Sequence, residues 1–172
     1  NNLDYKVSVV AASIASFTMA STASATTLVL AHGEGGFDNS ANTYTLDSIS
    51  VPENSRVLIK DGVNSASSGV HHKWNGIYTV GSLTGTTLTL TRVTDFNSTS
   101  TMSPGSMIPV EQGSTNLDKS FLLTNNSDIT VGTTAITITE FTASVADNSI
   151  TVEKMQDAAA NTVLVRDANN TG

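Results

Sequence analysis

The three histidines are the residues with the most obvious capacity for chemistry, and two of them, His71 and His72, are adjacent. Neighbouring residues on a strand point to opposite faces, so this pair cannot chelate one metal ion from a regular strand. Only His32 could join them, and no carboxylate stands at a ligand spacing. We interpret the pair as part of a polar loop before Trp74 and keep both as weak ligand-binding candidates. The sequence predicts no metal site.

The aspartates show no catalytic or calcium-binding pattern. Asp38, Asp61, Asp95 and Asp118 each lie in turn-like sequence, where an aspartate usually bonds to its own backbone. The paired acids and terminal glutamate of a calcium-binding loop are absent. A calcium site assembled from separate loops stays open as the minor alternative.

Phosphate-binding and nucleophile motifs are also missing. The glycine-rich stretch Gly33–Gly36 is not followed by Lys-Ser or Lys-Thr, so a phosphate cradle has little support. No Gly-x-Ser-x-Gly sequence occurs. Because the chain has no cysteine, thiolate catalysis, disulfides and cysteine-zinc sites are excluded. We therefore expect no enzymatic activity, no catalytic residue and no cofactor.

Two aromatic residues, Trp74 and Tyr78, have two interpretations. Together they could form a platform on which a sugar ring stacks. A single tryptophan in a β-rich domain is more often part of the core, and we favour that interpretation for Trp74.

The composition narrows the function classes further. The 172 residues carry a net charge of −7, with only 13% charged and 38% hydrophobic residues. Eight scattered cations do not make a nucleic-acid-binding surface, and no apolar run is long enough to insert in a membrane. The hydrophobic content also argues against a disordered chain. A domain without disulfides must gain stability in another way, and oligomerisation is one such way.

Short runs with period-two alternation, bounded by Gly, Asn, Asp and Ser, are the dominant pattern and predict an all-β fold, a compact antiparallel β-sandwich or barrel-like domain. The predicted strands are Tyr5–Val10, Thr27–Ala31, Thr43–Leu46, Arg56–Lys60, Gly76–Val80, Thr86–Val93, Ser106–Glu111, Lys119–Thr124 and Ala135–Phe141. The predicted core comprises Val57, Ile59, Ile77, Leu88, Leu90, Ile108, Leu122, Ile136, Ile138 and Phe141.

Two parts of the chain are predicted, a β-rich module over residues 1–146 and a connector or oligomerisation tail over residues 147–172. The tail is predicted to be extended, with a short helix over Val152–Asn161. It has too little neighbouring sequence to cover its apolar residues within one chain, so we expect an interface between subunits there. The candidate interface residues are Ile150, Val152, Met155, Val163, Leu164 and Val165. The absence of an initiator methionine suggests processing or a longer polypeptide.

Six segments in a fixed order resemble a β-rich module that recurs in tail-fibre and other virion fibre proteins of tailed bacteriophages. Each segment alone is weakly specific, but the order and spacing agree over roughly residues 3 to 142. The segments are Asp4–Val9, Asp47–Val51 leading into Arg56–Asp61, Asn75–Val80, Leu90–Phe96, Pro104–Gly105 with Val110–Gly113, and Leu123–Thr124 with Gly132–Phe141.

Two departures from the family pattern stand out. Phe121 occupies a position where the family commonly has tryptophan, and residues 64–74 form a longer loop than usual. The resemblance implies a non-enzymatic structural module of the virion, outside the cell. It also implies assembly as a homotrimer and contact with other virion proteins.

Two other functions remain open. The first is a receptor-binding tip that grips a host surface glycan, for which Trp74 and Tyr78 are the candidates. The second is a subunit of a prokaryotic surface filament or adhesin assembled by strand exchange, for which Leu3–Val10 is the candidate donor strand.

Overall fold

The computed structural model describes residues 4–17, 21–38, 43–62, 64–65, 69–84 and 86–142. The chain divides into two compact units, Asn1–Phe141 and Thr142–Gly172, and all described residues except Thr142 belong to the first. The predicted helix Val152–Asn161 lies outside the described residues. So do the candidate interface residues of the tail, Ile150, Val152, Met155, Val163, Leu164 and Val165.

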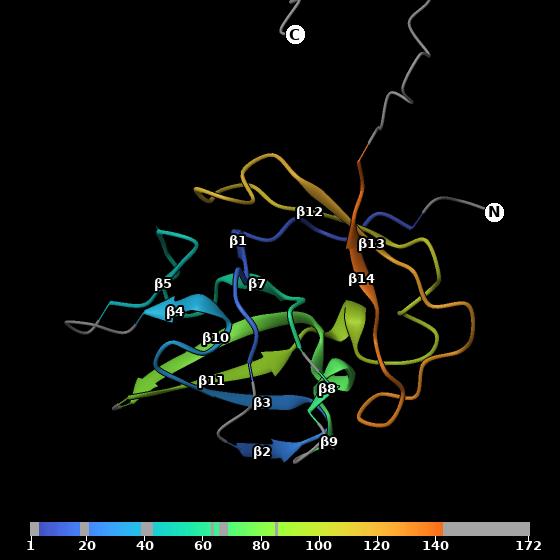
Figure 1. Ribbon diagram of the computed structural model, residues 1–172, viewed down its shortest axis with the longest axis horizontal. Helices are drawn as coiled ribbons and strands as arrows, with labels where there is room; N and C mark the ends of the chain where they lie inside the picture. The colour runs from blue at the N-terminus through green and yellow to red at the C-terminus, as the bar shows by residue number, and fades with distance from the viewer. Residues whose placement is uncertain are drawn as a thin grey trace, which may run out of the picture. The chain divides into compact units, whose positions relative to one another are not determined.

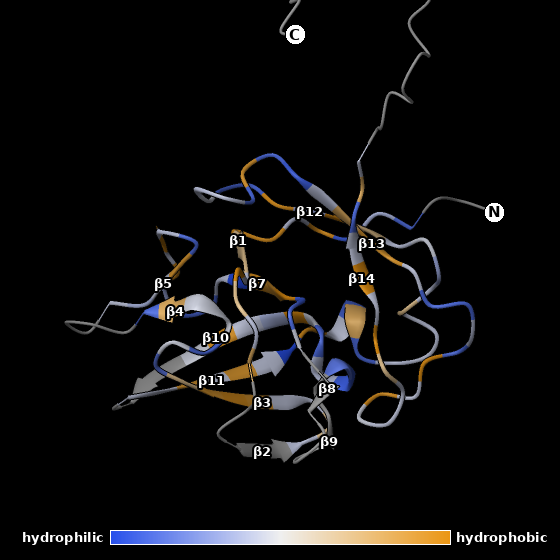
Figure 2. Ribbon diagram, viewed as in Figure 1, coloured by the Kyte–Doolittle hydropathy of each residue, from blue (hydrophilic) through white to orange (hydrophobic). Residues whose placement is uncertain are grey.

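Six strands form the largest sheet, in the spatial order β1-β7-β10-β11-β3-β2 (Figure 1). In chain order they are β1 (Ala11–Ala12), β2 (Ser21–Ser24), β3 (Thr27–Ala31), β7 (Arg56–Ile59), β10 (Gly76–Thr84) and β11 (Thr87–Arg92). Threonine alternates with leucine along β11, and β-branched residues suit a half-buried pleated surface. Strand β11 therefore buries Leu88 and Leu90 and exposes its threonines. Figure 2 shows the hydropathy changing along the β11 ribbon.

Three smaller sheets and three short 3₁₀ helices complete the described part of the chain. The sheets have the orders β12-β13-β14, β4-β5-β6 and β8-β9. Their strands are β4 (Phe37–Asp38), β5 (Thr45–Leu46), β6 (Ile49–Ser50), β8 (Asn64–Ser65), β9 (Gly69–Val70), β12 (Met107–Pro109), β13 (Ser120–Leu123) and β14 (Ile138–Glu140). The helices are η1 (Glu34–Gly36), η3 (His71–Trp74) and η4 (Thr94–Phe96).

Strands β7 and β10 are buried on both faces because a separate apolar core lies on each side. Val57, Ile59 and Tyr78 contribute to the first core, together with residues of β3 and β11. Leu58 and Ile77 point the other way and join the second core. The three-stranded sheet supplies that second core with Ile108, Phe121, Leu123 and Ile138. Burial on both faces explains the unbroken apolar run of β7.

The predicted all-β fold is confirmed, with open sheets rather than a closed barrel among the described residues. The named strand pairs are antiparallel except one, because β1 runs parallel to β7. Instead of a continuous strand Tyr5–Val10, the structure has isolated parallel bridges at Tyr5 and Val9, followed by β1. Alternation of side chains specifies which face a residue takes, and it carries no information on strand direction.

Eight of the ten predicted core residues are buried. The two errors are Leu122, which is half-buried, and Phe141, which is 54% exposed. In β13 the inner face is taken by Phe121 and Leu123, so the residue between them must point outward. Phe141 lies three positions after the buried Ile138, an odd spacing that also places it on the opposite face.

Candidate functional site

The N-terminal segment, residues 4–17, forms backbone hydrogen bonds with both the six-stranded sheet and the sheet β12-β13-β14. The Lys6 N–H donates to the Met107 carbonyl of β12 at 2.9 Å. Further along, the Ser13 N–H donates to the Leu58 carbonyl of β7 at 2.8 Å. This one extended segment therefore connects the edge of the six-stranded sheet to the edge of the three-stranded sheet, and Figure 1 shows its blue trace passing beside β12.

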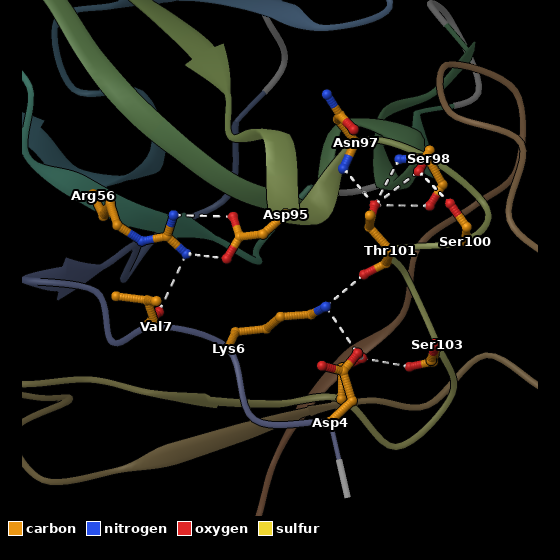
Figure 3. Close-up of polar contacts among 11 residues, drawn as sticks. Asp4, Lys6, Val7, Arg56, Asp95, Asn97, Ser98, Ser100, Thr101 and Ser103 are labelled. Atoms are coloured by element: carbon orange, nitrogen blue, oxygen red, sulfur yellow. Dashed lines mark hydrogen bonds and ion pairs between the residues drawn. The ribbon is translucent and has the colours of Figure 1, made fainter. Parts of the chain in front are cut away.

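A two-pronged ion pair anchors the middle of this segment (Figure 3). The two terminal nitrogens of Arg56 donate to the two carboxylate oxygens of Asp95, each at 3.0 Å. One of them also donates to the Val7 carbonyl at 3.2 Å. The planar guanidinium fits a carboxylate in this fork geometry, which fixes its orientation. Arg56 thereby ties β7 and η4 to the N-terminal segment.

A second charged cluster anchors the start of the segment (Figure 3). The buried Lys6 ammonium lies 2.8 Å from the Asp4 carboxylate and donates to the Thr101 carbonyl at 2.6 Å. The Ser106 hydroxyl donates to the same carboxylate at 2.7 Å. Burial alone would raise the pKa of Asp4, but the hydrogen bonds from Lys6 and Ser106 and the lysine charge outweigh it, so the pKa is lowered.

The aromatic candidates for sugar stacking lie inside the module. Trp74 is 6% exposed and Tyr78 is fully buried. The Tyr78 hydroxyl donates to the Trp74 carbonyl at 2.6 Å and accepts a hydrogen bond from Arg92 at 2.7 Å. Burial raises the pKa of Tyr78 to about 12, although the Arg92 charge opposes the shift. Neither ring offers an open face to a glycan, so the alternative of an exposed sugar-stacking platform is wrong, and the favoured interpretation of Trp74 as a core residue is confirmed.

The histidines do not gather into a site. His71 and His72 begin η3 rather than a strand, and His72 is half-buried. The His72 carbonyl accepts hydrogen bonds from the N–H groups of Asn75 and Ile136, at 3.0 and 3.1 Å. His32 lies 3.7 Å from the Asp38 carboxylate. Among the residues that the structure describes, no group of three or more His, Asp or Glu side chains could hold a metal ion.

Asp47 is a heavily bonded carboxylate that sequence reasoning missed. It accepts hydrogen bonds from the N–H groups of Thr115 and Asn116 at 2.9 and 2.8 Å, and from the Ser114 hydroxyl at 3.0 Å. Asp47 and Ser48 both have positive φ, 52° and 66°, and form the two-residue turn between β5 and β6. In the sequence, an Asp-Ser pair between two short apolar runs could have predicted this turn.

The hydrogen bonds to the Asp47 carboxylate decide the direction in which its pKa is shifted. Burial would raise its pKa, but the hydrogen bonds from Asn116, Thr115 and Ser114 outweigh burial and lower the pKa. The carboxylate form therefore stabilises the fold at pH values above the unfolded pKa of about 3.9, and this contribution is lost as pH falls through the lower folded pKa.

We expect Asp47→Asn to lower the free energy of unfolding at pH 7 by about 1–3 kcal/mol, because amide acceptors are weaker than a carboxylate and the NH₂ group cannot accept. Asparagine tolerates the positive φ, so the turn itself is preserved. The deficit should shrink as the pH falls below about 4. Urea unfolding at a series of pH values measures it. Asp118→Asn, at an exposed acid with φ of 58°, is the matched control and should change little. An equal deficit at pH 2 and pH 7 would contradict the assignment.

The side chains of Arg56, Lys6 and Asp47 thus hold segments of the module together. Neither a scan against protein-family models nor searches of curated proteins and of solved structures found a match to this chain. Across the described ranges, no helix has the length and apolar character needed to cross a membrane.

Proposed function

We propose that this chain is a non-enzymatic structural module of a bacteriophage tail fibre, spike or other virion appendage, and that it works outside the cell. The observation that carries the proposal is the ordered set of six segments that resemble phage fibre modules. These segments lie between Asp4 and Phe141, within the first compact unit.

The use of the polar residues in these segments supports a structural role. Arg56 and Asp95 come from different segments of the resemblance and form the two-pronged ion pair. Asp4 and Lys6 pair within the first segment. These four charged side chains are engaged in internal contacts that join segments of the module, which supports a structural role for them.

Assembly is the second part of the proposal. The module has no disulfide and few aromatic residues, so association with other copies would add stability that a single copy lacks. The apolar residues of the tail favour contact between subunits. We propose a homotrimer that joins other virion proteins along an appendage, and a closed symmetric assembly of this kind buries equivalent surfaces on every copy. A contribution to host attachment is compatible with this location.

Immunogold electron microscopy tests the location. An antibody against the recombinant chain should label the fibres or spikes of tailed phage particles, because an appendage module is exposed on the virion. The control is the same antibody after absorption with the purified chain. Labelling of filaments on the host cell envelope, with bare phage particles, would favour the surface-filament alternative and contradict the proposal.

A further inference from the structure

Two dipeptides of this chain are chemically labile in a flexible polypeptide. Asn75-Gly76 is the only Asn-Gly pair in the sequence, and Asp61-Gly62 is the only Asp-Gly pair. Asparagine is among the thermolabile residues, and a following glycine has no side chain to hinder attack by its own backbone nitrogen. In an open chain we therefore expect both pairs to rearrange spontaneously.

The reaction needs only the chain itself and water. The Gly76 nitrogen attacks Cγ of Asn75, a C–N bond forms, and the side-chain nitrogen leaves as ammonia, which gives a cyclic succinimide. Water then opens the ring at either of its carbonyls, and the product is aspartate or isoaspartate. In isoaspartate the backbone continues through the former side-chain carbon. At Asp61-Gly62 the same ring forms from the carboxylic acid with loss of water.

The fold holds the Asn75 amide at both its oxygen and its nitrogen. Oδ1 accepts a hydrogen bond from the Gly62 N–H at 2.9 Å, and Nδ2 donates to the Ile136 carbonyl at 3.0 Å. Asn75 is 1% exposed, so the water that would open the ring is excluded. Gly76 is also fixed, because it begins β10 and pairs with Ile59 of β7. These contacts keep the amide carbon from turning toward the Gly76 nitrogen.

A single hydrogen bond restrains both dipeptides. The Gly62 N–H that donates to Asn75 contains the nitrogen that would attack the Asp61 carboxyl group, and Gly62 is buried. The Asp61 carboxylate is held separately, by the Ser13 hydroxyl at 2.5 Å and by the Lys60 ammonium at 3.1 Å. The electrophile of one pair and the nucleophile of the other are therefore held by the same contact.

Packing explains why the labile Asn-Gly pair is present at this position. An amide side chain offers both the acceptor that the Gly62 N–H needs and the donor that the Ile136 carbonyl needs. A Cβ at position 76 would collide with the guanidinium of Arg92, so this position requires glycine. The contacts that build the fold thus select a dipeptide that is stable only while the fold is closed.

The reaction products do not fit the closed module. An ionised aspartate at position 75 accepts hydrogen bonds only, so the Ile136 carbonyl would lose its donor and face a buried negative charge. Isoaspartate also lengthens the backbone directly before β10, which displaces Gly76 from its pairing with Ile59. A module that has reacted while open therefore cannot close as before.

We propose that Asn75-Gly76, together with Asp61-Gly62, is a modification site that makes opening of the module permanent. The closed module is protected by the hydrogen bond between Gly62 and Asn75 and by burial. The reaction rate in the native protein then equals the rate in a flexible chain multiplied by the fraction of molecules that are open. This role goes beyond the proposed function and does not depend on where the chain works.

Ageing of the full-length wild-type chain tests the proposal without any substitution. Samples are kept at mildly alkaline pH in native buffer and in concentrated guanidinium chloride, beside a synthetic peptide of residues 59–79 in both solvents. Peptide mass spectrometry follows loss of the Asn75 amide, and an isoaspartyl methyltransferase assay on the separated peptides detects isoaspartate at both sites.

Protection by the fold is the expected result. In denaturant the chain should react within about twofold of the peptide, and in native buffer at least about a hundredfold more slowly at both sites. A native chain that reacts at either site within about threefold of the peptide overturns the proposal, because the closed module would then give no protection.

Refolding measures whether the change is permanent. Chains aged in denaturant and chains denatured only briefly are returned to native buffer, and their urea unfolding midpoints are compared. Chains modified at Asn75 should fail to refold or unfold at lower urea, whereas briefly denatured chains should regain the original midpoint. Asn75→Asp, which copies one product, should act in the same way. Asn126→Asp makes the same change at an exposed asparagine and should leave the midpoint unchanged. Modified chains with the original midpoint overturn the proposal.

Discussion

Replacing Leu90 with alanine is expected to lower the free energy of unfolding by about 2–5 kcal/mol. The side chain is fully buried. It pairs with Val80 of β10 on one side and with Leu28 of β3 on the other, at the centre of the six-stranded sheet. Three strands meet at this position, so the neighbours cannot collapse into the space without moving a paired backbone.

Thr91→Ala is the matched control for Leu90→Ala. Thr91 is the next residue of β11, is exposed, and points to the opposite face. Its replacement should lower the free energy of unfolding by the difference in β-propensity between threonine and alanine. Any further change should be less than about 0.5 kcal/mol. Urea unfolding at one fixed protomer concentration measures both variants, because association makes apparent stability depend on concentration. A loss below about 0.5 kcal/mol for Leu90→Ala would show that this face of β11 does not carry the core.

Arg92→Ala is expected to cost about 3–5 kcal/mol, because several buried polar groups lose their donor at once. Arg92 is 3% exposed, and its guanidinium lies 4.7 Å from the centroid of the Tyr78 ring. One terminal nitrogen donates to the Asn75 carbonyl at 2.9 Å, and the other donates to the Tyr78 hydroxyl at 2.7 Å. Burial lowers the pKa of Arg92, and the Tyr78 interaction opposes that shift.

Arg92→Met separates the cost of losing the hydrogen bonds from the cost of losing the side-chain volume. Methionine fills much of the same volume, so its deficit of about 1–3 kcal/mol should report mainly the carbonyl and hydroxyl left without a donor. The deficits are measured by urea unfolding, again at fixed protomer concentration. A methionine variant as stable as wild type would mean that the buried charge costs as much as its hydrogen bonds contribute.

Gly76 provides an independent test of the same packing. Its φ is 151°, and a Cβ at this position would collide with a terminal nitrogen of Arg92. We therefore expect Gly76→Ala to be destabilising in the wild type and less so when Arg92 is already alanine. Full additivity of the two substitutions would show that Arg92 and Gly76 do not share this space.

The internal contacts tie segments of the module that are far apart in the sequence. The N-terminal segment is held by Arg56, by Lys6 and by backbone bonds to two sheets. The loop after β12 is held by Asp47. A module in a fibre transmits force along the chain, and such anchors resist the loosening of its ends.

The sequence by itself determined the strand pattern and most of the core. The run Thr27–Ala31 was predicted with the bounds it has as β3, and the alternation in β11 placed Leu88, Leu90 and Arg92 on one face, where all three are buried. These features follow from the two-residue period of a strand, which is a local property that a sequence records directly.

Only the tertiary structure decided how the strands pair and which polar residues matter. The parallel pairing of β1 with β7 depends on the path of the chain between them, which alternation does not encode. Asp47 became the main anchor of a loop almost seventy positions away, a contact that no local pattern predicts. The outward positions of Leu122 and Phe141 depend on which of two apolar faces meets the core. A sheet with apolar residues on both faces leaves that choice to packing against the rest of the fold.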